Sequence, residues 1–333
     1  MYEFTTSERT VGIAAEYETK ALLYLMSYRK DSADIDTFII DCFNDVTGSD
    51  NDLRKLWDVQ SKGDKNLSPK LIGKYLVTLF QNFVSNIDFE HYILLVRDIH
   101  KDYLHKEKVA FGFDNFDDDR QTRIKNGLKQ EYERRNKKAA DDIAVDYFLT
   151  KVMFYCAKDK KQEFVKKIIK FKSKIHFQDT LLEAIFDEIR NEQAKLKTID
   201  VFGKKISDPQ EVLAYKKHLS RTNIETLVVN RFIGMELFND NTVPFEFMDI
   251  IRGLDKEDVK DIIQDCNADI GRTLFNKNNG YAFWYLLEEI LTMVKKNPHL
   301  DAQQIYAIKP LRIPYTMNEM SVKYLISLII GGL

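Results

Sequence analysis

The chain has 333 residues, of which 44% are hydrophobic and 31% are charged. This composition is ordinary for a globular protein, and the length allows roughly two or three domains. The formal net charge of −2 excludes a uniformly basic protein that coats nucleic acid. Any affinity for DNA would have to come from local basic runs or from a partner.

The three cysteines, Cys42, Cys156 and Cys266, lie far apart in the sequence. Their number and spacing do not suit a disulfide framework or a zinc cluster, and they are typical of a reducing cytosol. The first four residues lack a basic region and an apolar core, so we expect no signal peptide. The apolar tail 324–333 is too short to span a bilayer. We therefore expect a cytoplasmic protein without membrane contact.

The first sixty residues predict one helix and two strands. Apolar side chains in residues 10–28 recur at steps of three and four, which is typical of an amphipathic helix. Residues 36–46 and 55–62 have the composition of strands, and the segment 48–51 between them is rich in turn formers. The two strands should therefore form a hairpin.

A second helix should begin at Ser68, which can cap it, with Pro69 at its first position. We expect this helix to continue to about Ser85. Residues 91–97 form a short apolar run and predict a central strand. Residues 117–142 are densely charged and should be mostly helical.

The remaining sequence predicts helices almost throughout. The apolar residues 146–156 would form a last strand or a buried helix, and two helical segments follow between 162 and 197. Residues 199–209 contain a glycine and a proline and are the best candidate for a linker. We expect an α/β domain at 1–204, with a mixed sheet flanked by helices, and an all-α domain at 205–333.

The most informative stretch runs from Trp57 to Lys62. Successive side chains of a strand point to opposite faces, so Asp58, Gln60 and Lys62 would share one face. A structural strand has little reason to carry such a face beside the acid-bearing segment 41–45. Carboxylate and amide oxygens hold a hard cation, and a lysine can orient water or stabilise charge on phosphate. The pattern indicates a divalent-metal site that cuts phosphodiesters.

The order of helix, hairpin, Gln60-Ser61-Lys62 strand, helix and strand resembles the PD-(D/E)XK nuclease fold in its glutamine form. More closely, residues 11–100 resemble the N-terminal nuclease domain of bacterial anti-phage effectors. These are the CD-NTase-associated effector nucleases and the nuclease subunit of Lamassu-type systems. The opening from Gly12 to Tyr17-Glu18 resembles the glycine, aromatic and acid-or-amide start of that family. The C-terminal part does not resemble the nucleotide-sensing domain of the first group. The resemblance implies a restriction-endonuclease-like N-terminal domain.

The resemblance also implies roles for individual residues. Lys62 matches the catalytic lysine, and Gln60 takes a position usually held by Asp or Glu, where its carbonyl oxygen would serve Mg²⁺ or Mn²⁺. The metal-binding aspartate should lie on the first hairpin strand, where Asp45 is the first choice and Asp41 the alternative. Asp58 would be a further metal ligand, or would pair with Lys62 without a metal. The competing interpretations are a solvated edge strand for Gln60 and Lys62, and a turn former for Asp45.

Glu18 is the fourth candidate catalytic residue. Its helical neighbours include Ala14, Ala21 and Leu22, and a carboxylate in an apolar stripe is costly unless it is paired or bound to metal. The family often has an acidic or amide residue on this helix. The alternative is an ordinary glutamate at the helix edge.

Two basic segments could neutralise phosphates, the run from Arg134 to Lys138 and residues 166–174. Acids closely flank the first run, and both segments lie on predicted helices, so a solvated helix face is the simpler interpretation. Residues 166–172 contain no acid and form the better DNA-binding candidate.

These observations predict a magnesium-dependent endonuclease for double-stranded DNA that acts as the effector subunit of a bacterial anti-phage defence system. The resemblance further implies that the helical domain docks on other defence subunits, such as an SMC-like ATPase. One alternative is a non-catalytic scaffold that binds DNA or a partner through a degenerate nuclease-like domain. Another is a helical signalling adaptor whose strands cap a bundle. The apolar residues 322–330 should be covered either by the helical domain itself or by a partner.

Overall fold

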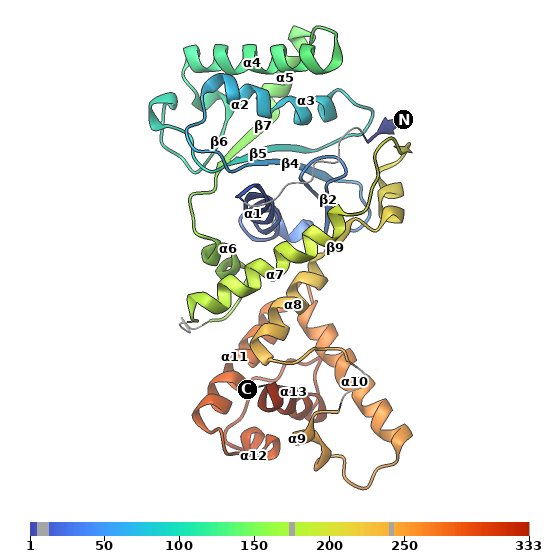
Figure 1. The fold of residues 1–333 in the computed structure, drawn as a ribbon. Helices are drawn as coiled ribbons and strands as arrows, with labels where there is room; N and C mark the ends of the chain where they lie inside the picture. Colours follow the sequence, from blue (N-terminus) through green and yellow to red (C-terminus); the bar gives the residue numbers. More distant parts are fainter. Residues whose placement is uncertain (5–12, 173–176, 240–242, 333) are drawn as a thin grey trace. The chain divides into compact units, whose positions relative to one another are not determined.

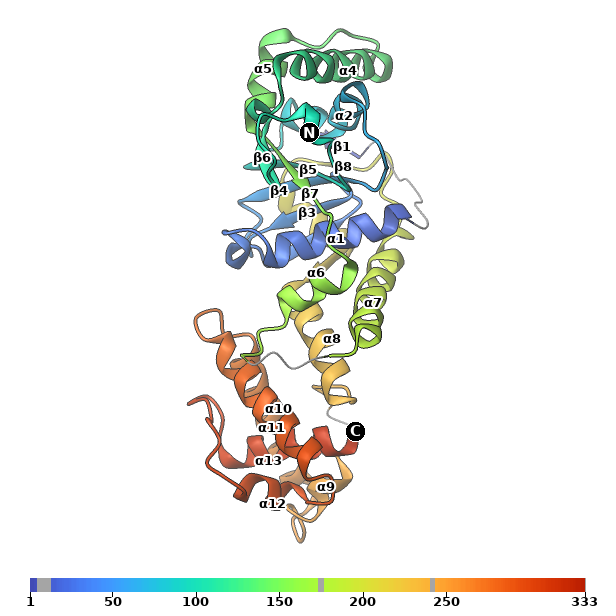
Figure 2. The ribbon, with the colours of Figure 1, turned by 90° about the vertical axis from the view of Figure 1, so that its left-hand side faces the viewer.

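The computed structural model describes residues 1–4, 13–172, 177–239 and 243–332. The chain forms two compact units. Unit 1 consists of residues 1–166 and 182–221, and unit 2 consists of residues 167–181 and 222–333. Figure 1 and Figure 2 show a sheet with covering helices in unit 1 and a set of helices in unit 2.

Among the described residues, unit 1 contains a mixed sheet of seven strands in the order β6-β7-β5-β4-β3-β2-β9. The strands are β2 (Thr37–Ile40), β3 (Val46–Ser49), β4 (Leu56–Lys62), β5 (His91–Val96), β6 (Ala110–Gly112), β7 (Val152–Cys156) and β9 (His218–Ser220). The neighbours β4, β5 and β7 run parallel, and the other neighbouring pairs are antiparallel. A separate antiparallel pair joins β1 (Tyr2–Glu3) to β8 (Lys205–Ile206).

Helices cover both faces of this sheet (Figure 1, Figure 2). On one face, α1 (Ile13–Ser27) contacts β3, β4 and β5. The other face carries α2 (Pro69–Tyr75), α3 (Val77–Phe83), α4 (Asp118–Asn136) and α5 (Asp142–Lys151). The coarse prediction of a mixed sheet flanked by helices is confirmed. Gly12 and the expected helix start at 10–12 lie outside the described residues.

The expected strand at 36–46 is confirmed only over Thr37–Ile40, because the chain leaves β2 after Ile40. Asp41 has a left-handed backbone with a φ of 51°, a conformation that aspartate tolerates better than most residues. The next strand, β3, begins only at Val46. Asp41 and Asp45 therefore lie in a connection between strands and do not share a strand face.

The expected turn at 48–51 begins later than predicted, because β3 extends to Ser49 and pairs with both β2 and β4, and the turn to β4 follows at residues 51–52. Gly48 lies inside this strand where α1 passes close by. A Cβ atom at Gly48 would lie 2.9 Å from Cγ2 of Ile35 and 3.1 Å from Cδ1 of Leu25. This glycine therefore serves close packing, as glycines inside strands often do. The predicted hairpin is a three-stranded antiparallel meander.

Ser68 begins α2 as predicted, since its Oγ accepts a hydrogen bond from the amide of Leu71 at 3.3 Å. The expected helix to Ser85 is two helices, α2 and α3, which meet at Leu76. The predicted strand at 91–97 is confirmed as β5.

Two glycines bring α2 and α4 together at backbone distance. A Cβ atom on Gly73 would lie 2.0 Å from the carbonyl oxygen of Ile124, and one on Gly127 would lie 2.3 Å from that of Lys70. No side chain fits between the helices at this crossing. The position of α2 is therefore fixed relative to α4.

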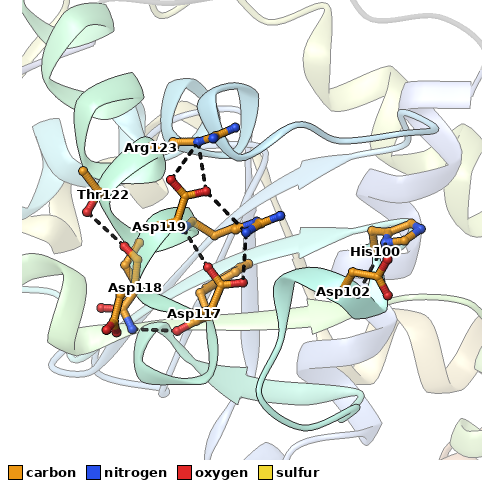
Figure 3. A network of polar contacts seen from close by, with 10 residues as sticks. His100, Asp102, Asp117, Asp118, Asp119, Thr122 and Arg123 are labelled. Carbon is orange, nitrogen blue, oxygen red and sulfur yellow. Dashed lines mark hydrogen bonds and ion pairs between the residues drawn. The ribbon is translucent and has the colours of Figure 1, made fainter.

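The first turn of α4 carries aspartates, and its last turn carries two arginines. At the N-terminal end, the Asp117 side chain accepts a hydrogen bond from the Arg120 amide at 2.9 Å, and Asp119 pairs with Arg123 (Figure 3). The last turn carries Arg134 and Arg135. Acidic side chains at the start of a helix and basic ones at its end interact favourably with the helix dipole.

The proposed linker at 199–209 is part of unit 1. It follows α6 (Lys161–Ile168) and α7 (Asp179–Lys197). Tyr2 of β1 pairs with Ile206 of β8, and Phe38 of β2 pairs with Leu219 of β9. Residues 205–221 therefore pack with the sheet, whereas we expected a boundary after residue 204. The strand β9 also interrupts the region that was expected to be wholly helical.

Unit 2 is helical. Its helices are α8 (Arg221–Ile233), α9 (Phe245–Met248), α10 (Lys256–Leu274), α11 (Gly280–Lys296), α12 (Ala302–Ala307) and α13 (Glu319–Gly332). In α13, Val322, Leu325 and Ile329 are fully buried, and the helix contacts α9, α10, α11 and α12. The unit thus covers the apolar residues 322–330 itself, as the first of the two predicted alternatives, cover by the helical domain or by a partner, requires. In the described parts of both units, none of the helices has the length and apolar character that a membrane crossing requires.

Gly73→Ala should lower the free energy of unfolding of unit 1 by about 1–3 kcal/mol, because overpacking outweighs the helix propensity of alanine. The matched control is Gly271→Ala in α10, where the new Cβ would lie 3.6 Å from the Phe238 ring in ordinary contact. That substitution should be neutral or stabilising for unit 2. Urea unfolding of both variants provides the measurement. A gain in stability for Gly73→Ala would contradict the close helix crossing.

Candidate active site at the end of β4

The connection 41–45 brings Asp45 to the end of β4. Because Val46 pairs with Val59, the preceding residue Asp45 lies opposite Gln60. Oδ2 of Asp45 accepts hydrogen bonds from Gln60 Nε2 at 2.7 Å, from the Ser61 amide at 2.7 Å and from Ser61 Oγ at 2.8 Å. Within the described part of the chain, no group donates to Oδ1. One carboxylate oxygen therefore fixes Asp45 to β4, and the second is available to a ligand.

Asp58, Gln60 and Lys62 share the face of β4 that is turned to α2 and α3, as strand alternation predicts. Asp58 reaches Asn82 of α3, and Nζ of Lys62 lies 5.5 Å from the ring centroid of Tyr75 on α2. The Gln60 amide nitrogen donates to Asp45, so its Oε1 atom remains an acceptor.

Asp45, Gln60 and Lys62 line one narrow pocket. Its full lining is Asn44, Asp45, Gln60, Lys62, Lys74, Tyr75, Thr78 and Arg135. The set contains three cationic side chains and one carboxylate. Such an excess of positive charge favours an anionic ligand.

Asp58 does not line this pocket. It is completely buried, and it accepts hydrogen bonds from Asn82 Nδ2 at 2.7 Å and from Thr47 Oγ1 at 3.3 Å. A third donor, Asn44 Nδ2, lies 3.5 Å from Oδ2 of Asp58. Burial raises the pKa of the Asp58 carboxyl to about 7, although these hydrogen bonds oppose the shift. Both oxygens thus have protein donors, and the structure places Asp58 as a support of β4 and not as the direct metal ligand that we expected.

Asp41 and Glu18 belong to a different network. Asp41 pairs with Nζ of the fully buried Lys217 at 3.3 Å, and burial raises the pKa of the Asp41 carboxyl. Glu18 is buried and pairs with Lys197 of α7, which also attracts Asp41. The cost of burying Glu18 in an apolar stripe is therefore offset by a lysine. Neither carboxylate lines the pocket, and Asp45, not Asp41, lies beside Gln60.

The oxygen atoms that are available as metal ligands suit magnesium or manganese. No group of three His, Cys, Asp or Glu side chains gathers at metal-binding distance in the described residues, and the three cysteines are buried thiols. Zinc sites use such groups, whereas Mg²⁺ is commonly held by one or two carboxylates, waters and substrate phosphates. Oδ1 of Asp45 and Oε1 of Gln60 fit that second pattern.

Two cations of the pocket were not predicted as site residues. Lys74 lies on α2, and Arg135 belongs to the run Arg134 to Lys138, which could neutralise phosphates but for which a solvated helix face was the simpler interpretation. The sequence alone places neither residue at this pocket, because the packing of α2 on α4 brings them together. In the segment preferred as a DNA-binding candidate, 166–172, Lys166 pairs with Glu163 and Lys170 pairs with Glu225. Residues 173 and 174 lie outside the described residues.

Comparisons of the chain with models of protein families, with curated proteins and with solved structures found no match. The assignment of a candidate site therefore depends on the geometry of this chain.

The raised pKa of Asp58 predicts a pH-dependent stability. Its folded-state value of about 7 lies above the usual 3.8, so folding takes up a proton between these two values. Its contribution to the free energy of unfolding should therefore fall as the pH rises through this window. Asp58→Asn removes the titration, so its stability relative to wild type should increase from pH 4 to pH 7.

Urea unfolding followed by Trp57 fluorescence would measure this difference. A Trp284→Phe background confines the signal to unit 1, since the chain has only these two tryptophans. A stability difference that stays constant with pH would show that Asp58 does not titrate in this way.

Proposed function

We propose that the chain is a magnesium-dependent endonuclease of double-stranded DNA, with unit 1 as its catalytic domain. The observation that carries the proposal is the convergence of Asp45, Gln60 and Lys62 on one pocket that holds more positive than negative charge. Oxygen ligands for a hard cation and donors for an anion are both needed to hydrolyse a phosphodiester.

Each protein group would have a distinct part in the hydrolysis. Oδ1 of Asp45 and Oε1 of Gln60 would hold Mg²⁺ or Mn²⁺, which supplies Lewis-acid polarisation of the scissile phosphate when bound. In its charged form Lys62 has three donors and no acceptor. It would therefore orient the attacking water and stabilise the growing charge on the phosphate oxygens.

The covalent change is a displacement at phosphorus. The water oxygen forms a new bond to phosphorus while the bond to the leaving ester oxygen breaks. The water loses a proton to solvent, and the leaving oxygen takes one up from solvent. Because the ammonium form of Lys62 cannot accept a proton, we assign it a positioning and charge-stabilising role and not that of a base.

The order of elements in unit 1 also supports the proposal. A helix, α1, precedes the antiparallel strands β2, β3 and β4, and two helices then lead to β5, which is parallel to β4. This order is the one that the resemblance to the PD-(D/E)XK nucleases leads us to expect. The pairing of β3 with β4 opposes the alternative in which the strands only cap a helical bundle.

The biological setting follows from the resemblance to anti-phage effector nucleases. In that setting the protein would act in the cytoplasm of a bacterium, and unit 2 would dock on other defence subunits such as an SMC-like ATPase. Because α13 is buried within unit 2, docking would use other side chains. Phe245 and Tyr315 are exposed by 85% and 82% and are the best anchors.

Lys62→Ala should reduce Mg²⁺-dependent cleavage of supercoiled plasmid by at least about 100-fold, as expected for loss of one donor to the transition state. The matched control is Lys70→Ala, an exposed α2 residue outside the pocket, which should cut at the wild-type rate. Cleavage by Lys62→Ala at the wild-type rate would refute the proposed chemistry. A folded wild-type chain that binds DNA without cutting it in Mg²⁺ or Mn²⁺ would favour the scaffold.

A further inference from the structure

Lys74 and Arg135 have no part in the chemistry assigned to Asp45, Gln60 and Lys62, yet they line the same pocket. A pocket that served a free divalent cation alone would be acidic, because additional cations repel the metal ion. The surplus of positive charge is useful only if the metal arrives together with an anion. The two cations therefore point to a second contact with the substrate.

Glu131 determines how Arg135 is held. The Glu131 carboxylate is buried, and its Oε1 accepts a hydrogen bond from Arg135 Nε at 2.9 Å. Arg134 binds the same carboxylate through Nε at 2.9 Å and Nη2 at 2.6 Å. Arg134 is 67% exposed and does not line the pocket. Within the described residues Arg135 donates only through Nε, so its terminal Nη groups remain for a ligand.

The crossing of α2 and α4 fixes the two helices that carry these cations. Lys74 directly follows Gly73, which meets the α4 backbone at Ile124. In the described part of the chain, no carboxylate forms an ion pair with Lys74 or Lys62 within the pocket. Two helices held at backbone distance thus present two cationic groups beside the end of β4. This arrangement is preorganised for an anion and needs no movement of either helix.

We infer that Lys74 and Arg135 form a clamp for a backbone phosphate of the DNA, next to the phosphate that Asp45, Gln60 and Lys62 would address. The inference rests on the proposed nuclease function and adds to it how the strand is held. Guanidinium groups bind phosphate through two parallel hydrogen bonds, and an ammonium binds it as a point charge. Since the contact is with phosphate, it positions the strand without reading its sequence.

The test measures DNA binding without cleavage, using the full chain with Lys62→Ala as the common background. Fluorescence anisotropy of a short labelled duplex in Mg²⁺ gives the affinity at several salt concentrations. Adding Lys74→Ala or Arg135→Ala should weaken binding about tenfold at low salt. Each substitution should also reduce the slope of log affinity against log salt by about 1.

Arg134→Ala is the matched control, because it removes a neighbouring arginine that shares the Glu131 partner but lies outside the pocket. It should leave affinity and salt slope unchanged. Lys74→Arg keeps the charge and should retain the slope, which separates loss of charge from misfolding. Equal effects of Arg134→Ala and Arg135→Ala, whether large or absent, would overturn the clamp. Failure of the proposed function has a different signature: the wild-type chain would then not cut plasmid in Mg²⁺ or Mn²⁺, or Lys62→Ala would cut it at the wild-type rate.

Discussion

The attachment of Asp45 to β4 is the interaction on which the candidate site depends. One carboxylate oxygen receives a side-chain amide, a backbone amide and a hydroxyl from two consecutive residues, Gln60 and Ser61. Hydrogen bonds to a charged group are each worth about 1.5–3 kcal/mol. Together they hold the connection 41–45 against the sheet and orient Gln60 at the same time. Without this attachment, the Asp45 carboxylate would have no fixed position relative to the cations of the pocket.

The rest of unit 1 determines which charges surround that attachment. The face of the sheet under α2–α5 is apolar at Leu94 and Phe154, and β4 is the strand that departs from this character. The cost of burying Asp58 there is offset only in part by amide and hydroxyl donors. Above it, α2 and α4, which cross at two glycines, carry Lys74 and Arg135 to the candidate site. In the function that we propose, this arrangement would serve a metal ion and a phosphate together.

Features that depend on local physics could be predicted from the sequence. The alternation along β4 gave the shared face of Gln60 and Lys62, and Ser68 marked the start of α2. Features set by distant contacts could not. The partner of Glu18 is Lys197, which lies 179 residues away. A left-handed Asp41 breaks the expected strand. The places of Lys74 and Arg135 in the pocket depend on the α2–α4 crossing, so the basic run around Arg135 indicated phosphate contacts only as an alternative to a solvated helix face.

The most direct test of the central claim is the affinity of the full chain for Mn²⁺, measured by electron paramagnetic resonance with a non-cleavable phosphorothioate duplex present. Asp45→Asn should weaken Mn²⁺ binding at least about tenfold, because a ligand loses its charge. Asp41→Asn should have a much smaller effect, because Asp41 faces Lys217. Unchanged Mn²⁺ affinity in a folded Asp45→Asn variant, or a larger loss in Asp41→Asn, would contradict a metal site built on Asp45 and Gln60.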